Sequence, residues 1–348
     1  MLFVYLCANM CKEVGFTTFR NIFRVSNPAI WAKGALKLKK NDLYEKFHLF
    51  QGRVSSPDGC FSPSSGQHCA DSVDPTSFIP LLFEHPQAEM QYYSFSESSL
   101  STLLVDTYEV RNTEQRDIYY PILPTPCVCL YFKFNQESIQ SVFCGTTSFI
   151  SSLHLPPNHT VFCARFRPGV SDFFTQTPAK KLTDSTFSLN VFLPSASDLI
   201  REVQHCGSFA ERTLSIQSYF ASHPYTAEYE DHALFNRGAR LIHQRHGILR
   251  VSEIAETLSC SERYLCRMFN NWVGISTKQY CELVQMQFSL QEILSKRPKT
   301  LAKTAISFGY FDQPHMNRVY QKFLGRTASD MLFFNETSCN MTSMPVII

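Results

Sequence analysis

No stretch of this 348-residue sequence stays apolar for the ~18–20 residues that a membrane-spanning helix requires, so we expect no membrane association. The first eight residues are mostly apolar, but no charged segment precedes them, which disfavours a secretory signal. With 44% hydrophobic and 18% charged residues, the composition is that of ordinary folded domains and not of a disordered chain.

The sequence also lacks the short motifs that mark common enzymes. It has no Gly-rich loop ending in Lys-Ser or Lys-Thr to cradle phosphate, and no Gly-x-Ser-x-Gly elbow to present a nucleophilic serine. We therefore expect no catalytic residues, no cofactor and no metal site, and we predict that the protein is not an enzyme.

The cysteines form no regular framework. There are 13 of them, an odd number, scattered from Cys7 to Cys339. A chain of this length does not need disulfides for stability, so we expect reduced thiols and a cytoplasmic location. Cys127 and Cys129 would share one face of a strand, either as small buried apolar residues or as a redox or metal-binding pair.

The first two thirds of the chain divide by local pattern. Residues 1–80 contain clusters of Ser, Pro and Gly and are expected to be irregular. Residues 81–194 alternate short apolar and aromatic runs with turn residues, which predicts a sheet or small barrel. Residues 195–230 change to a period near 3.6 and predict a helical connector. The clearest predicted strands are 128–134, 141–144 and 161–166.

Residues 231–335 are predicted to be wholly helical, with residues 336–348 as a tail. The helical part carries 14 Lys/Arg and 8 Asp/Glu, a net charge of +6, while the rest of the chain has a net charge of −4. A basic part beside a mildly acidic remainder fits a polyanionic partner that binds on one side only. The predicted fold class is α+β: a β-rich domain of sensory type, followed by an all-α domain.

Two helices joined by a tight turn are predicted between residues 251 and 274. Ser252 and Ser261 are placed to cap them, and Gly274 supplies the left-handed residue that ends the second. This is the pattern of a helix-turn-helix unit, whose second helix enters a major groove of DNA. Its inner faces comprise Ile254, Ala255, Leu258, Leu265, Met268 and Phe269. The outward residues expected to contact DNA are Arg263, Cys266, Arg267 and Asn270.

The same arrangement recurs about fifty residues later. A helix that ends near Phe308 is followed by a turn at Gly309, a second helix capped by Asp312, and an ending at Gly325; a short helix then starts at Thr327. The inward residues are Met316, Val319, Tyr320 and Phe323. The outward residues expected to contact DNA are Gln313, His315, Arg318 and Lys322.

Between the two units, residues 278–294 predict one helix of ~24 Å at ~1.5 Å per residue. A spacer of this size would hold two recognition helices near one turn of DNA apart, ~34 Å. The two units together predict a protein that binds double-stranded DNA.

These residues resemble the AraC/XylS family of transcription regulators. The stronger match is in the second unit, with Gly309-Tyr310-x-Asp312-Gln313-x-His315-Met316-x-Arg318-x-Tyr320-x-Lys322. The first unit follows the family through Tyr264-Leu265-x-Arg267-x-Phe269 to Gly274. The resemblance implies a bacterial, sequence-specific regulator that activates promoters, with its two recognition helices in successive major grooves. It also implies that the residues facing the bases are Arg263, Cys266, Arg267, Gln313, His315 and Arg318.

Three residues depart from the family pattern. Pro314 stands where a polar residue is usual, Ala328 where Pro is usual, and Gln285 where the linker helix commonly has Arg. Proline is tolerated in the first turn of a helix, so the first departure is harmless. The loss of Arg at position 285 removes either a phosphate contact or a structural one.

A second resemblance lies upstream. Phe143-Cys144-Gly145 and Ala164-Arg165-Phe166-Arg167-Pro168-Gly169 resemble an uncharacterised β-rich domain often found before this DNA-binding unit. It implies a sensory or dimerising role. Arg165 and Arg167 would share a strand face and would bind an anionic effector if that face lines a cavity; otherwise they are a surface charge pair.

The expected partners are promoter DNA, with RNA polymerase, a small-molecule effector and a second copy of the chain as further candidates. The alternative function is a DNA-modifying or repair enzyme that carries the AraC-type unit as a tail. Some relatives join the unit to an alkylation-repair domain with a zinc-bound cysteine cluster, but no Pro-Cys-His-x-Cys motif occurs here.

Overall fold

The computed structural model describes residues 88–96, 98–193, 196–223, 230–332 and 345–348. The irregular segment predicted for residues 1–80 lies outside this part of the chain. No helix within it is both long enough and apolar enough to cross a membrane.

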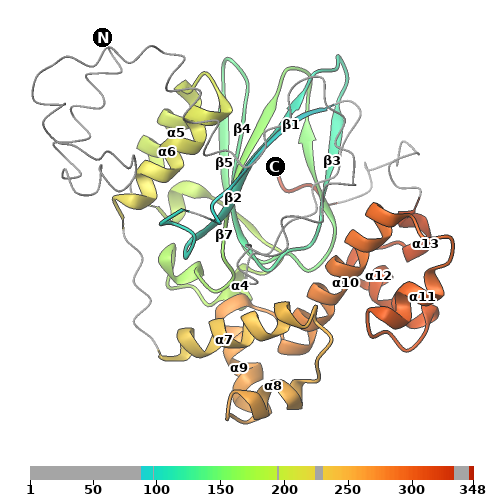
Figure 1. The fold of residues 1–348 in the computed structure, drawn as a ribbon. Helices are drawn as coiled ribbons and strands as arrows, with labels where there is room; N and C mark the ends of the chain where they lie inside the picture. The colour runs from blue at the N-terminus through green and yellow to red at the C-terminus, as the bar shows by residue number, and fades with distance from the viewer. Residues whose placement is uncertain (1–87, 97, 194–195, 224–229, 333–344) are drawn as a thin grey trace, which may run out of the picture. The chain divides into compact units, whose positions relative to one another are not determined.

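The β-rich part is built on a six-stranded antiparallel sheet in the order β1-β2-β7-β4-β5-β8 (Figure 1). A second, two-stranded antiparallel sheet pairs β3 with β6. The three runs that the sequence predicts as strands fall in β4, β5 and β7, so that prediction is confirmed. The strands are β1 (Ala88–Ser94), β2 (Leu104–Asn112), β3 (Ile118–Ile122), β4 (Val128–Phe134), β5 (Ile139–Cys144), β6 (Ser151–Leu155), β7 (Thr160–Phe166) and β8 (Thr186–Ser188).

The central strands are buried on both faces, which explains why β4 and β7 are almost continuously apolar. Successive side chains of a strand point to opposite faces. Val128, Leu130 and Phe132 accordingly enter one apolar cluster, while Cys129 and Tyr131 enter the other.

Helices α5 (Ala196–His205) and α6 (Phe209–Ala221) cover the first of these faces (Figure 1). Leu199, Ile200 and Val203 are buried there, as their spacing predicts. In α6, Ile216 and Phe220 are also buried. The predicted connector is thus a layer of the β-rich part. We call residues 88–223 the β-domain, including the short helices η3 (Ser171–Phe173), α4 (Ala179–Leu182) and η4 (Leu189–Val191).

Residues 230–332 are helical, as the sequence predicts, and we call them the helical domain. Its helices are α7 (Glu230–Gln244), α8 (Val251–Thr257), α9 (Glu262–Val273), α10 (Thr277–Lys296), α11 (Leu301–Ser307), α12 (Gln313–Leu324) and α13 (Ala328–Met331).

The last four residues of the chain lie along β6 of the smaller sheet. Ser152 of β6 donates to Pro345 and accepts from Ile347, and His154 donates to Ile348. The side chains of Ile347 and Ile348 are buried. This end of the predicted tail is therefore joined to β6 by a single parallel β-bridge between Ser152 and Val346.

Candidate DNA-binding site

The first two-helix unit consists of α8 and α9, and its second helix is capped as predicted. The Ser261 hydroxyl accepts from the Tyr264 N–H at 3.2 Å, and Gly274 ends the helix with a φ of 78°. Gly274 meets a second constraint as well, because a Cβ there would lie 2.1 Å from the hydroxyl oxygen of Thr183 in the β-domain. Only glycine satisfies both conditions.

The predicted cap at Ser252 is wrong. Helix α8 already begins at Val251, so Ser252 lies inside the first turn and is exposed. The Glu253 carboxylate closes this end instead, accepting from the N–H of Arg250 at 2.8 Å. The carboxylate also suits the positive end of the helix dipole.

The inner faces of both units are packed as predicted. Each of the ten apolar residues assigned to them is at most 7% exposed, and all belong to one hydrophobic cluster. The helix period read from the sequence therefore has the correct phase. Because that phase is correct, the polar residues assigned to the outward faces lie on the side of each helix away from this cluster.

The outward residues of α9 differ in their exposure to solvent. Arg263 and Arg267 are exposed, and the Arg267 guanidinium lies over the Tyr264 ring at 5.1 Å. Cys266 and Asn270 are partly buried, and the Asn270 amide donates to the Cys266 carbonyl at 2.8 Å. The two arginines are thus the residues of α9 best placed to reach a groove.

The second unit, α11 and α12, repeats the design. The Asp312 carboxylate accepts from the His315 N–H at 2.6 Å, and Gly325 ends α12 with a φ of 62°. Pro314 lies in the first turn, where its missing N–H costs no helix hydrogen bond. The predicted helix start, end and proline tolerance are all confirmed.

The four outward residues of α12 have distinct surroundings. Arg318 is exposed, and Gln313 is partly exposed. His315 accepts through Nδ1 from the Phe311 N–H at 3.2 Å, so this ring also fixes the turn. Lys322 donates to Glu282 of α10 at 2.7 Å, a partner that lies 40 residues away and that sequence reasoning missed. The ion pair reduces the availability of Lys322 for phosphate.

Helix α10 is bonded to the second unit through buried polar contacts. Its Ser289 hydroxyl lies 3.2 Å from the Tyr310 hydroxyl and 2.9 Å from that of Tyr320. Gln285 donates to the Phe308 carbonyl at 2.7 Å. At this departure from the family pattern the side chain makes a structural contact, which ties the turn of the second unit to the linker helix.

The departure at Ala328 also gains a contact. The N–H of Ala328 donates to the side-chain oxygen of Asn317 in α12 at 3.1 Å. Proline has no N–H and would not make this bond. Ala328 therefore links α13 to the recognition helix.

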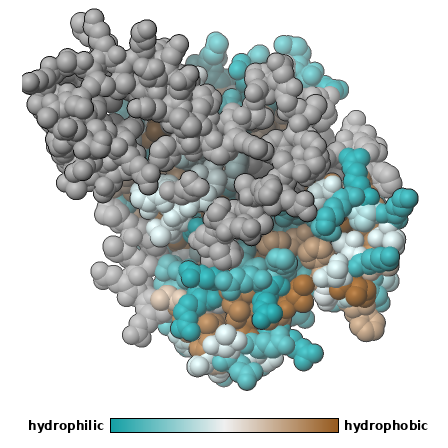
Figure 2. Space-filling model, in the orientation of Figure 1, coloured by the Kyte–Doolittle hydropathy of each residue, from teal (hydrophilic) through white to brown (hydrophobic). Residues whose placement is uncertain are grey.

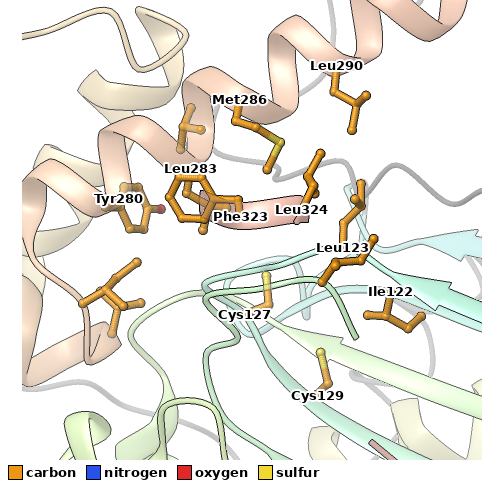
Figure 3. Packing of buried hydrophobic residues seen from close by; sticks show 14 of the residues in the cluster. Ile122, Leu123, Cys127, Cys129, Tyr280, Leu283, Met286, Leu290, Phe323 and Leu324 are labelled. Carbon is orange, nitrogen blue, oxygen red and sulfur yellow. The ribbon is translucent and has the colours of Figure 1, made fainter. Parts of the chain in front are cut away.

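The β-domain bonds directly to the linker helix α10 and to the recognition helix α12 of the second unit. Ile150 donates its N–H to the carbonyl of Phe323, in the last turn of α12, at 2.8 Å. Gln287 of α10 donates to the Pro124 carbonyl at 2.7 Å. Figure 3 shows Leu123 of the β-domain near Leu324 within the apolar packing around these bonds.

The two residues assigned to an anionic effector are engaged inside the protein. Arg165 donates to Asp106 of β2 through Nε at 2.9 Å and through a second nitrogen, and its side chain is 5% exposed. Burial raises the pKa of Asp106 although the guanidinium opposes that change. Arg167 follows β7 and donates to the Ser101 carbonyl. The effector assignment remains a prediction.

Cys127 and Cys129 lie in the same cluster and are fully buried. Burial raises the pKa of the Cys127 thiol to about 12, which keeps it protonated and unreactive near neutral pH. This agrees with the first of the two alternatives, a pair of small apolar core residues.

Sequence reasoning missed one prominent feature of the second unit. Phe311, in the turn before α12, is 84% exposed. It follows the buried Tyr310 and precedes the cap Asp312, and a turn residue carries no periodicity that would fix its face. The sequence does contain one signal. Two aromatic residues are adjacent in this turn, and a single buried aromatic is enough to anchor it, so the other would be exposed.

Comparisons with known proteins agree with these two parts. Residues 254–332 match a helix-turn-helix domain family, and residues 98–188 match a domain of unknown function, DUF6597. The Msm operon regulatory protein of Streptococcus mutans is 27% identical over 116 residues, which make up 33% of this chain and 41% of that protein. The match thus spans about two fifths of the length of that relative.

Solved structures of ToxT from Vibrio cholerae are also similar. One has 10% sequence identity and a TM-score of 0.35, and covers 65% of this chain and 97% of its own. Another, with a bound unsaturated fatty acid, has 12% identity and a TM-score of 0.31; the match covers 72% of this chain and 96% of that structure's chain. These scores are too low to assign a fold, which rests on the strands and helices of this chain.

Proposed function

We propose that the chain is a DNA-binding transcription regulator of the AraC type, because residues 254–332 match a helix-turn-helix domain family and follow a β-rich domain. Its recognition helices α9 and α12 would enter successive major grooves. The observation that carries this proposal is the duplicated unit: each recognition helix has a side-chain cap, a glycine ending, a buried apolar face and an exposed polar face.

Control through the β-domain is part of the proposal. The carbonyl of Phe323 in a recognition helix accepts from Ile150, and Gln287 of the linker helix bonds to Pro124. A change in the β-domain that moves the segment around Ile150 or the one around Pro124 would therefore act on the recognition helix α12 or on the linker helix α10. An effector, a second copy of the chain and RNA polymerase are the partners through which such control would operate, in the cytoplasm.

The alternative, an enzyme with this unit as a tail, has less support. Neither matching family is described as an enzyme, and the curated relative is named as an operon regulator. We therefore propose that the protein acts by binding DNA and not by modifying it.

The test is selection of duplexes from random-sequence DNA by the full chain, followed by guanine methylation interference on the selected duplex. We expect one preferred sequence with interference in two major-groove patches about one helical turn apart. Binding without preference for any sequence would refute the proposal. Interference in one patch alone would refute the use of both recognition helices.

A further inference from the structure

Phe311 is the most exposed large apolar residue in the part of the chain that the structure describes, at 84%. In Figure 2, brown and tan atoms reach the surface at the lower end of the α11–α12 unit, among teal side chains. Water surrounds most of this ring, so the ring gains little from burial within the protein.

The ring does not stabilise the turn in which it lies. A hydrophobic residue just before a helix cap often packs on the fourth residue of the helix, which here is Met316. Met316 is fully buried, yet Phe311 remains exposed, so Met316 is covered by other residues. The turn is held by other groups as well: Gly309 with a φ of 75°, the Asp312 cap, and the bond from the Phe311 N–H to His315.

The position of Phe311 points to DNA as its partner. It directly precedes the N-terminal end of α12, and in helix-turn-helix units that end of the recognition helix contacts the base edges. Its backbone is bonded to His315, one of the residues expected to face bases. The helix that follows Phe311 carries the partly exposed Gln313 and the exposed Arg318, and polar and basic side chains of this kind suit nucleic acid better than an apolar protein surface.

We propose that the Phe311 ring contacts the 5-methyl group of a thymine in the major groove, beside the bases met by Gln313 and His315. This rests on the proposed function. The thymine methyl is the one apolar group that a base pair presents in the major groove, and phenylalanine is among the side chains that contact it. Phe311 would thus add a preference for A·T at one position of the binding site.

The experiment uses the full chain and the duplex that it selects from random-sequence DNA. Each thymine is replaced singly by deoxyuridine, which removes only the methyl group. For the unmodified protein we expect about a four-fold loss of affinity at one position, which corresponds to ~0.8 kcal/mol for one buried methyl. Phe311→Ala should bind the unmodified duplex several-fold more weakly and lose the deoxyuridine effect at that position alone.

Two matched variants serve as controls. Ile306→Ala removes another exposed apolar side chain, 62% exposed on α11, and should keep the deoxyuridine effect. Phe311→Leu keeps an apolar side chain and should therefore keep part of the deoxyuridine effect. The melting temperature of Phe311→Ala should equal that of the unmodified protein, since the ring contributes little to the core.

Three outcomes would overturn the inference. The first is that Phe311→Ala retains the full deoxyuridine pattern. The second is that Phe311→Ala loses affinity equally on selected and random duplexes, which would indicate contact with the sugar-phosphate backbone. The third is an unchanged affinity of Phe311→Ala, which would show that the ring does not contact DNA. If the unmodified chain selects no sequence at all, the proposed function itself fails, which is a separate result.

Discussion

Single residues in the β-domain show how buried charge fastens a helix to the sheet. Arg212 of α6 donates to Glu109 of β2 at 2.7 Å, and both side chains are 8% exposed. A buried pair adds little net stability compared with apolar packing, but a single remaining charge has neither water nor a partner. Removing one residue of the pair is therefore expected to destabilise the fold by much more than the intact pair stabilises it.

Arg212→Met is expected to lower the free energy of unfolding by ~3–5 kcal/mol, because it leaves the Glu109 carboxylate buried alone. Urea denaturation of the full chain measures this. The control is Arg201→Met, whose pair with Asp198 is 71% and 73% exposed. That change should cost less than ~0.5 kcal/mol. Equal losses in the two variants would show that burial does not determine the cost.

Arg267→Ala and Arg318→Ala are each expected to weaken binding to the selected duplex by ~1–3 kcal/mol, the value of a bidentate base contact. Both side chains are exposed, so the melting temperature should not change. Titration of the full chain against selected and random duplexes separates the two kinds of contact. A loss that is the same on both duplexes would assign the arginine to phosphate. Arg201→Ala, in the β-domain, is the control.

Sequence patterns predicted the faces of these residues but not their partners. The helix period placed Lys322 on the outside of α12, yet its partner Glu282 is 40 residues away. Arg165 was assigned to a strand, but Asp106 is 59 residues away and reaches it only through the pairing of β2 with β7. Such partners depend on tertiary packing and strand register, which periodicity does not contain.

At the scale of helices and strands, the two recognition helices begin at side-chain caps of the same kind. Ser261 and Asp312 each accept from the N–H three residues further on. The first turn of each helix is the part expected to meet the bases, so loss of a cap would fray the residues needed for binding.

Asp312→Ala and Ser261→Ala are each expected to lower the free energy of unfolding by ~1 kcal/mol, because each leaves a helix N–H without its acceptor. Ser252→Ala is the control: this serine is exposed within the first turn of α8 and caps nothing, so its removal should change stability by less than ~0.5 kcal/mol. Urea denaturation of the three variants gives the comparison. A loss at Ser252 as large as at Ser261 would contradict the assignment of the caps.

The strands were predicted better than the layer that covers them. Continuous apolar runs located β4 and β7 because strands buried on both faces have no polar side. One of these two faces is covered by α5 and α6, whose Leu199, Val203 and Phe220 share a cluster with Leu130 and Phe132 of β4. Interpreting residues 195–230 as a connector missed this, since amphipathic spacing shows that a helix packs but not against what.

At the scale of the whole described chain, one apolar cluster runs from the sheet into the helical domain. Cys129 and Tyr131 of β4 belong to the same cluster as Met286 of α10 and Phe323 of α12. The sequence correctly separated a β-rich from a helical part, but it did not reveal that they share a core, because each has its own complete apolar periodicity.

The last prediction concerns the helical domain in isolation. A fragment of residues 231–335 should fold and bind DNA, because it keeps its caps, most of its core and a net charge of +6, whereas the rest of the chain has −4. Counterion release depends on the number of phosphates contacted, so the fragment and the full chain should show the same slope of log affinity against log salt concentration. The fragment should unfold at lower urea than the full chain, since it loses the packing of Met286 and Phe323 against the sheet and the bonds from Ile150 and to Pro124. Affinity of the full chain, residues 1–230 and residues 231–335 is measured across a salt series. If residues 1–230 bind DNA and residues 231–335 do not, the assignment of DNA binding to the helical domain is wrong.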